Sequence, residues 1–159
     1  MKAIFALVGF SGLRSQEVCN IKIEDIDLNT GKFEVLAKGD KMALRMMNSP
    51  TLTIIKEYLK EEGRNKGYLF VGIARRNRGG QIATSTLRTY LKNVCTAAGI
   101  SLKGLHGFRR GVADRMNANG ATIELIAEWL GHGQNIQTTI RYFRAKQADQ
   151  RLTEAARFV

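Results

Sequence analysis

The sequence predicts a mostly helical domain with a small antiparallel β-sheet near its N-terminus, an α+β fold. Apolar residues recur at helical spacing over most of the chain, whereas between residues 23 and 47 they alternate and are interrupted by two glycine-containing turns. The chain contains no internal repeat and no linker-like segment, and 44% of its 159 residues are hydrophobic. We therefore expect one domain, residues 1–159, that is large enough to bury a core.

The chain begins with two predicted helices. Residues 2–10 have helical apolar spacing, and the serine and glycine that follow end the pattern. Ser15, with Glu17 and Val18 after it, indicates the start of a short second helix. Arg14 and Glu17 then lie about one turn apart, within reach of each other.

The alternating segment predicts a β-meander of two or three strands. It reads IEDIDL, the turn NTG at 29–31, KFEVLA, the turn KGD at 38–40, and KMALRMM. Short alternating runs that are separated by turns of this kind form hairpins. Lys38 would then lie at the tight end of the second hairpin.

A further helix is predicted from Pro50, the only proline, to Gly63, because proline suits the first helical position and glycine the end. Residues 67–72 form a brief extended segment. Residues 74–81 are a basic, glycine-rich loop, which suits contact with a phosphate backbone but is equally typical of a solvated loop.

The rest of the chain is predicted to be helical, with capping residues before each apolar run and glycine or asparagine after most of them. The predicted helices begin at Thr84 or Ser85, around Leu105, at Thr122 and at residue 146, and they end at Gly99, near Asn119 and Gly120, at Gly131 and at residue 157.

The charge balance predicts a polyanionic partner. The chain has 25 Lys and Arg against 14 Asp and Glu, a net charge of +11 and a pI near 10.1. Nucleic acid is the commonest polyanion in a cell, although a basic surface can also be merely solvated. The basic residues are spread over loops and helix ends, which favours a folded binding face. The candidate DNA-binding residues are Lys41, Arg75, Arg76, Arg78, Arg110, Arg141 and Arg144.

Other classes of protein fit the sequence poorly. The longest apolar stretch, residues 3–10, is too short to cross a bilayer and lacks a signal-peptide cleavage site, so we expect a soluble intracellular protein with no membrane partner. Cys19 and Cys95 lie far apart and are expected to be buried, reduced thiols. A zinc site made from both cysteines and both histidines is formally possible, but no CxxC or HxxxH pair supports it.

Four short motifs carry the functional prediction: GLRSQE at 12–17, AKGDK at 37–41, LHGFRR at 105–110, and LGHGQNIQTTIRY at 130–142. Singly they are weak, because a histidine and an arginine three residues apart often serve only as a helix cap and a surface charge. In this order and combination they resemble the catalytic set of the tyrosine recombinase, or phage integrase, family, which is related in chemistry to type IB topoisomerases.

The resemblance implies a role for each matching residue. Tyr142 matches the nucleophile, and Glu17 matches the acidic residue that braces the site. The other matching catalytic residues are Arg14, Lys38, His106, Arg109 and His132. Tyr58, Tyr68 and Tyr90 are poorer candidates for the nucleophile, because they lie in apolar segments. The interval from His132 to Tyr142 is one residue longer than the family pattern.

These residue types suit attack by a phenol on a DNA phosphodiester. The pentacoordinate phosphorus gains negative charge on its non-bridging oxygens, which Arg14, Arg109 and His132 can stabilise without a metal ion. The absence of a carboxylate cluster in the motifs argues against a two-metal nuclease. His106 is the candidate base for the phenol, and Lys38 is the candidate acid for the leaving 5′ oxygen. We expect no cofactor, no metal and no ATP.

The resemblance further implies double-stranded DNA as the partner, and a tetramer on paired sites that is a monomer without DNA. It implies a DNA-associated location in the cytoplasm, at the nucleoid. Because the chain begins just before Arg14, we expect the family's N-terminal DNA-clamping domain to be absent. Residues 146–159 would pack on a neighbouring protomer or on their own domain. A topoisomerase-like nicking–closing enzyme and an inert DNA-binding accessory protein are the alternatives.

Overall fold

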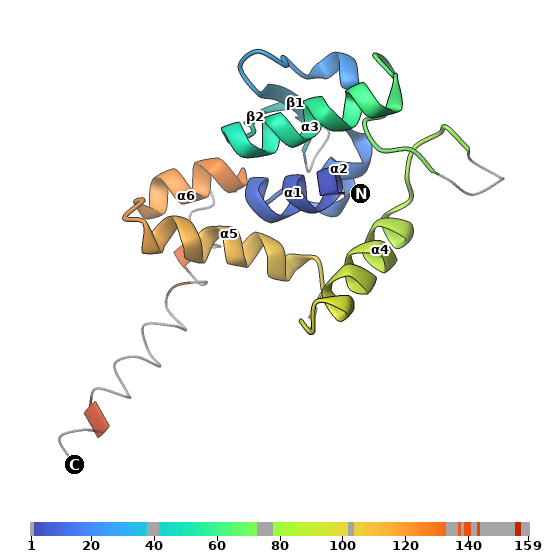
Figure 1. Cartoon of the computed structure of the whole chain (residues 1–159). Helices are drawn as coiled ribbons and strands as arrows, with labels where there is room; N and C mark the ends of the chain where they lie inside the picture. Colours follow the sequence, from blue (N-terminus) through green and yellow to red (C-terminus); the bar gives the residue numbers. More distant parts are fainter. Residues whose placement is uncertain are drawn as a thin grey trace.

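The computed structural model describes residues 2–37, 42–72, 78–101 and 104–132, together with residues 137, 139, 140, 143, 155 and 156. Their elements follow the order α1 (Lys2–Ser11), α2 (Ser15–Asn20), the 3₁₀ helix η1 (Ile23–Asp25), β1 (Lys32–Leu36), β2 (Met42–Met46), α3 (Ser49–Glu62), α4 (Thr84–Ala97), α5 (His106–Ala118) and α6 (Ile123–Leu130). The predicted mostly helical fold with a small antiparallel sheet is confirmed (Figure 1). The predicted helix at 146–157 lies outside the described residues.

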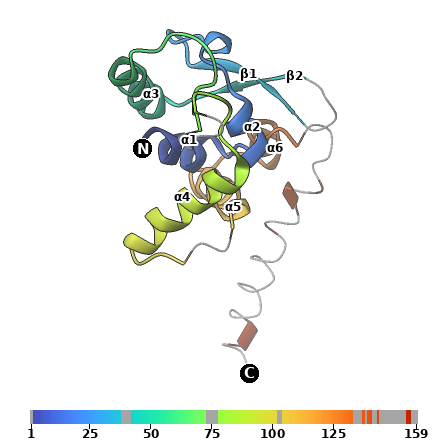
Figure 2. The same ribbon diagram turned by 90° about the vertical axis from the view of Figure 1, so that its right-hand side faces the viewer.

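Helix α1 lies at the centre of the fold, in contact with both α3 and α5 (Figures 1 and 2). Its sequence, KAIFALVGFS, is apolar on most sides, as expected for a helix that is covered by neighbours. A larger core cluster joins α1 and α2 to the sheet, α3 and α4. A smaller cluster lies between α5 and α6 and includes Phe143.

The sheet has two antiparallel strands rather than three. Phe33 pairs with Arg45, and Val35 pairs with Ala43, on the inner face. The first run of the predicted meander, IEDIDL, forms η1 and only one isolated bridge, from Ile26 to Phe33. Of the two or three strands predicted, two form. The first run is not a strand because Ile23 and Ile26 are three residues apart, and a 3₁₀ turn directs both side chains into the core.

Helix ends follow the predicted caps at most positions. The predicted cap Thr122 accepts a hydrogen bond through its hydroxyl from Leu125 N–H at the start of α6. At the start of α3 the cap is Asn48, which was not predicted; its side chain accepts from Thr51 N–H. The prediction that Thr84 or Ser85 caps α4 was wrong. The helix already begins at Thr84, and the extended residue Ala83 precedes it without a side-chain cap.

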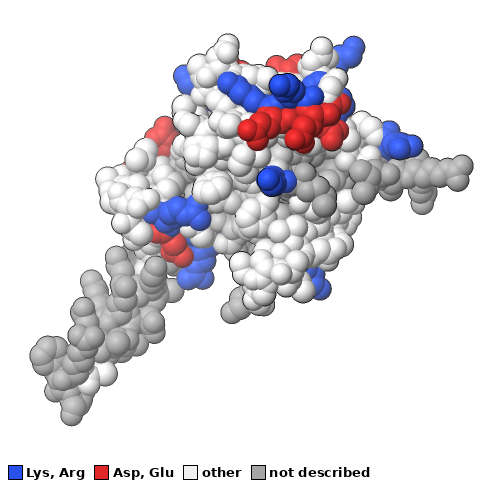
Figure 3. All heavy atoms as spheres, in the orientation of Figure 1, with Lys and Arg blue, Asp and Glu red and all other residues white. Residues whose placement is uncertain are grey.

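Among the described residues, no helix is both long and apolar enough to span a bilayer. On the face drawn in Figure 3, basic and acidic side chains lie next to each other over the part of the surface where Figure 1 places α3. That side of the fold is therefore mixed in charge, despite the net charge of +11.

Candidate active site

The predicted site forms where the turn between α1 and α2 meets the end of α6. Gly12, in that turn, has a φ of +64°, a conformation that glycine adopts without the steric cost of a side chain. A Cβ placed on Gly12 would lie 2.6 Å from Cδ2 of Leu130, the last residue of α6. Glycine therefore allows both the sharp turn and the close approach of α6.

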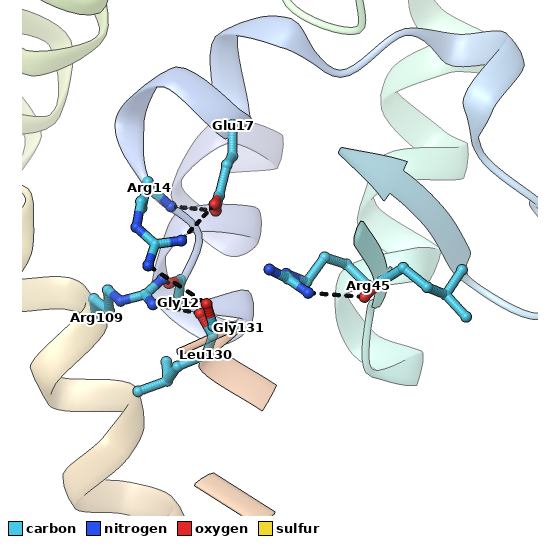
Figure 4. A network of polar contacts seen from close by, with 8 residues as sticks. Gly12, Arg14, Glu17, Arg45, Arg109, Leu130 and Gly131 are labelled. Carbon is cyan, nitrogen blue, oxygen red and sulfur yellow. Dashed lines mark hydrogen bonds and ion pairs between the residues drawn. The ribbon is translucent and has the colours of Figure 1, made fainter. Parts of the chain in front are cut away.

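Arg109 ties three segments together at this point. Its side chain on α5 is 2% exposed. Nη1 donates to the Gly12 carbonyl oxygen at 2.8 Å, and Nη2 donates to the Leu130 carbonyl oxygen (Figure 4). The last carbonyls of a helix lack partners within the helix and form the negative end of its dipole. The end of α6 therefore stabilises the buried positive charge of Arg109.

Arg14 and Glu17 form an ion pair at the start of α2. Nη1 of Arg14 lies 2.7 Å from Oε1 of Glu17, and the backbone N–H of Arg14 donates to Oε2 at 2.8 Å. Glu17 is 2% exposed, whereas a third of the Arg14 side chain is exposed. Nη2 of Arg14 also donates to the Gly131 carbonyl at 3.5 Å. Glu17 thus fixes the guanidinium of Arg14 and leaves one side of it open to solvent.

One pocket brings together three of the predicted catalytic residues, Arg14, His106 and Arg109. It has a volume of about 280 Å³, and it is lined by Leu13, Arg14, Ser15, Gln16, Leu105, His106 and Arg109. A second pocket of about 320 Å³ shares Ser15 and Leu105 with it and extends to Arg88 on α4. A larger, apolar cavity of about 600 Å³ lies elsewhere, between α1, α3 and α4. Its lining includes Tyr58, Phe70 and Tyr90, which suit a phosphodiester poorly.

His132 follows α6 directly and belongs to the same electrostatic group. Its Nδ1 lies 2.7 Å from the hydroxyl oxygen of Thr139, which is fully buried. Burial, and then the positive charges of Arg109 and Arg14, lower the pKa of His132 from 6.5 to about 4. His132 is therefore neutral near pH 7, and a neutral imidazole keeps one N–H that can donate to a ligand.

The remaining predicted residues divide into two groups. Arg78 and Arg110 are exposed. The others lie outside the described residues: Lys38, Lys41, Arg75, Arg76, Arg141, Tyr142 and Arg144.

Sequence reasoning missed two side chains that contribute to the site. Thr139 belongs to the TT pair of the fourth motif, and that pair was the available signal. Arg45 on β2 points toward the Arg14–Glu17 pair (Figure 4) and interacts with its charges. Its only signal was a position on the inner face of a strand. Among the described residues, no group of three or more His, Cys, Asp or Glu side chains could hold a metal ion.

A helical core with a two-stranded hairpin and a pocket of arginine and histidine side chains defines one class of protein, the tyrosine-recombinase catalytic fold. The model of the phage integrase family matches residues 1–149, and the chain belongs to that family.

The similar proteins are Xer recombinases. The chain is 36% identical over 144 residues to the tyrosine recombinase XerA of Pyrococcus furiosus, covering 90% of this chain and 49% of that protein. It is 31% identical over 153 residues to XerC of Halalkalibacterium halodurans, covering 89% of this chain and 48% of that protein. The chain thus spans about half the length of the curated relatives it matches.

Solved structures agree with this family. A crystal structure of XerA recombinase matches with a TM-score of 0.76 at 29% identity, covering 94% of this chain and 56% of that one. The XerH recombinase in a post-cleavage complex with its difH substrate also matches with a TM-score of 0.76, at 25% identity, covering 98% and 44%. The fold derived above is therefore the fold of these recombinases.

Proposed function

We propose that the chain is the catalytic domain of a site-specific DNA recombinase or integrase. It cleaves and rejoins DNA strands through a 3′-phosphotyrosyl intermediate, with neither metal nor ATP. The strongest support is that Arg14, His106 and Arg109, from separate parts of the sequence, line one pocket. The XerH neighbour, which was solved with its DNA substrate after cleavage, gives independent support.

The pocket supplies fixed positive charge to the reacting phosphate. Arg14 offers a guanidinium that Glu17 holds in place with one side open. Arg109 is anchored by two carbonyls, so its charge needs no reorganisation when the phosphorus becomes pentacoordinate. With His132 Nδ1 accepting from the Thr139 hydroxyl, the imidazole proton lies on Nε2, which donates to a non-bridging oxygen.

Tyr142 is the nucleophile. Its hydroxyl oxygen attacks the phosphorus, and the bond from phosphorus to the 5′ oxygen breaks. The phenol proton passes to His106, and the leaving 5′ oxygen takes a proton from Lys38. Because the new phosphotyrosyl bond replaces one phosphodiester bond, a second 5′ hydroxyl reverses the step and joins a different strand.

The partner is double-stranded DNA, which Lys41, Arg75, Arg76, Arg78, Arg110, Arg141 and Arg144 contact. The chain is a monomer without DNA and assembles as a tetramer on two paired sites, where residues 146–159 pack on a neighbouring protomer. It acts where the DNA is, at the nucleoid in the cytoplasm of a prokaryotic cell or a virus-infected host.

Covalent trapping tests this proposal. On a nicked or phosphorothiolate suicide DNA substrate, the wild-type chain should become attached to the strand that carries the 3′ phosphate. Tyr142→Phe should form no adduct, because phenylalanine has no hydroxyl to attack the phosphorus. The measurement is the DNA-dependent shift of the protein on a denaturing gel, followed by peptide mapping of the attached residue.

Two controls make the trapping result specific. Tyr90→Phe removes a hydroxyl from α4, in the lining of the apolar cavity, and should leave adduct formation unchanged. EDTA should also have no effect, because the positive charge at the phosphate is part of the protein. Adduct formation by Tyr142→Phe at the wild-type rate would overturn the assignment of the nucleophile, and dependence on magnesium would overturn the reaction class.

A further inference from the structure

Arg45 is a basic residue that faces inward on β2. The outer face of the strand carries Met42, Leu44 and Met46, all exposed, whereas Arg45 lies opposite the buried Phe33 on the inner face. An inward position on a short amphipathic strand normally takes an apolar side chain. A guanidinium here costs desolvation energy, so its surroundings must compensate.

Those surroundings are the candidate active site. A Cβ placed on Gly131 would lie 1.8 Å from Nη2 of Arg45 and 2.5 Å from its Cζ, so the guanidinium lies directly against the backbone of Gly131. Figure 4 shows the side chain reaching from the sheet toward Glu17 and Gly131. Gly131 has a φ of +64°, and it lies between the end of α6 and His132. Arg45 therefore contacts the turn that carries a predicted phosphate donor.

Charge also links Arg45 to the Arg14–Glu17 pair. Burial lowers the pKa of Arg45, the carboxylate of Glu17 raises it, and the guanidinium of Arg14 lowers it. Glu17 is thus a buried carboxylate between two guanidiniums. Its hydrogen bonds go to Arg14, and its charge stabilises Arg45 as well. Removal of Arg45 would leave Glu17 to neutralise Arg14 more completely.

Not every donor of the Arg45 guanidinium has a hydrogen-bond partner among the described residues. Nη1 donates to the carbonyl of Leu44 at 2.9 Å. Nε is buried and has no hydrogen-bond partner among the described residues. A buried donor without a partner is costly, and such donors are typical of sites where function, and not stability, has selected the residue.

We propose that Arg45 is a positioning residue of the cleavage site. It fastens β2, and with it the hairpin that carries Lys38, to the Gly131–His132 turn and to the Arg14–Glu17 pair. This inference rests on the proposed function. Without that contact, the general acid on the hairpin and the phosphate donors on the helices would be held by separate parts of the fold. Arg45 couples their positions.

Arg45→Met tests this role, because methionine is a long, flexible side chain without charge. At saturating suicide DNA, the rate constant of adduct formation should fall by about 10- to 100-fold, the size of effect that a displacement of about 1 Å produces in an active site. The dissociation constant for DNA should change far less. The rate constant of adduct formation for Arg45→Lys should lie between those of the wild type and Arg45→Met, because lysine keeps the charge but lacks the planar group that lies on Gly131.

Lys32→Met is the matched control, since it removes one positive charge from an exposed position of the same sheet. It should react at the wild-type rate at saturating DNA. If the wild-type chain forms no adduct, the proposed function fails and this role fails with it. If the wild-type chain forms the adduct and Arg45→Met reacts equally fast, the inference alone is overturned.

A double-mutant cycle tests the contact itself. Gly131→Ala introduces a Cβ that collides with the guanidinium of Arg45, in addition to the backbone strain at φ +64°. In an Arg45→Ala background only the strain remains, so Gly131→Ala should cost less, in thermal stability and in cleavage rate, than it does alone. Equal losses in the two backgrounds would show that the residues act independently, and would overturn the inference.

Discussion

His132 shows how the immediate surroundings of one side chain determine its protonation state. Its pKa is about 4, because burial and two arginines disfavour the imidazolium. The Thr139 hydroxyl lies at Nδ1 of the neutral ring and can donate to it or accept from it, so the ring keeps one N–H in either tautomer. A permanently charged donor beside Arg14 and Arg109 would repel both. On the proposed function, a neutral donor would add a hydrogen bond to the phosphate without that repulsion.

The lowered pKa of His132 predicts how stability depends on pH. The unfolded chain has the ordinary value of 6.5 and the folded chain about 4, so between these values the unfolded state binds a proton that the folded state does not. The free energy of unfolding should therefore rise with pH from about 4 to 6.5, and this contribution should level off above that window. Chemical denaturation at a series of pH values measures it.

His132→Gln provides the comparison, because glutamine keeps a polar side chain that does not titrate. The variant should lose part of the slope between pH 4 and 6.5 while other groups contribute as before. Identical slopes for the two proteins would contradict the lowered pKa. With only two histidines in the chain, NMR titration can assign the resonance directly by its loss in this variant.

At the scale of elements, the site depends on how closely α6 approaches the turn between α1 and α2. The carbonyls of Gly12 and Leu130 must lie on either side of the Arg109 guanidinium to bind it. Gly12 permits this spacing because it has no side chain. The approach of the two helices thus decides where the arginine points.

Gly12→Ala should therefore destabilise the chain more than Gly63→Ala. The two glycines have φ values of +64° and +63°, and both lie at helix ends, so alanine meets the same backbone strain at each, about 1–2 kcal/mol. At Gly12 the new Cβ also meets Leu130 at 2.6 Å, whereas at Gly63 nothing lies within 4 Å. Thermal unfolding of both variants measures the difference.

The same pair separates stability from activity. Gly12→Ala should slow DNA cleavage, because moving α6 displaces the carbonyls that hold Arg109, while Gly63→Ala at the end of α3 should cleave normally. Equal destabilisation by the two substitutions would mean that α6 can move away from residue 12 without loss of stability. The close approach of α6 to Gly12 would then not be needed for the fold.

Most elements were predictable because their signals are local. Apolar periodicity and the capping residues Gly63, Thr122 and Gly131 indicate where helices begin and end, and the structure agrees at these places. The stretch at 23–28 left a third strand open, because Ile26 and Leu28 alternate as in a strand, whereas the spacing of Ile23 and Ile26 fits a 3₁₀ turn. Only packing against β1 distinguishes these two possibilities.

The site was partly predictable for a different reason. Arg14, Glu17 and Arg109 were identified by their motifs, and the pair formed by the first two follows from helical spacing. The carbonyls that hold Arg109 could not be predicted, since backbone acceptors have no sequence signature. Arg45 was also not predicted, because its contact with Gly131 joins segments that only the folded chain brings together.

At the scale of the whole molecule, the predicted site lies on one side of the central helix α1. Helix α3 lies on one side of α1, where basic and acidic side chains mix (Figure 3). Helix α5 lies on the other side and carries the predicted catalytic histidine and arginine, with the exposed Arg110 next to them. On the proposed function, DNA contacts the side that bears the predicted site, where Arg110 is an exposed basic residue.

The proposed function predicts how salt affects DNA binding. Each phosphate that the protein neutralises releases counterions, so the logarithm of the affinity should fall linearly with the logarithm of the salt concentration. Arg110→Ala should reduce that slope by about one, because it removes one phosphate contact. Lys60→Ala removes the same charge from an exposed position on α3 and should leave the slope unchanged. Fluorescence anisotropy over a salt series measures all three slopes. Equal reductions in both variants would mean that DNA attracts the net charge of the domain and not the face that bears the site.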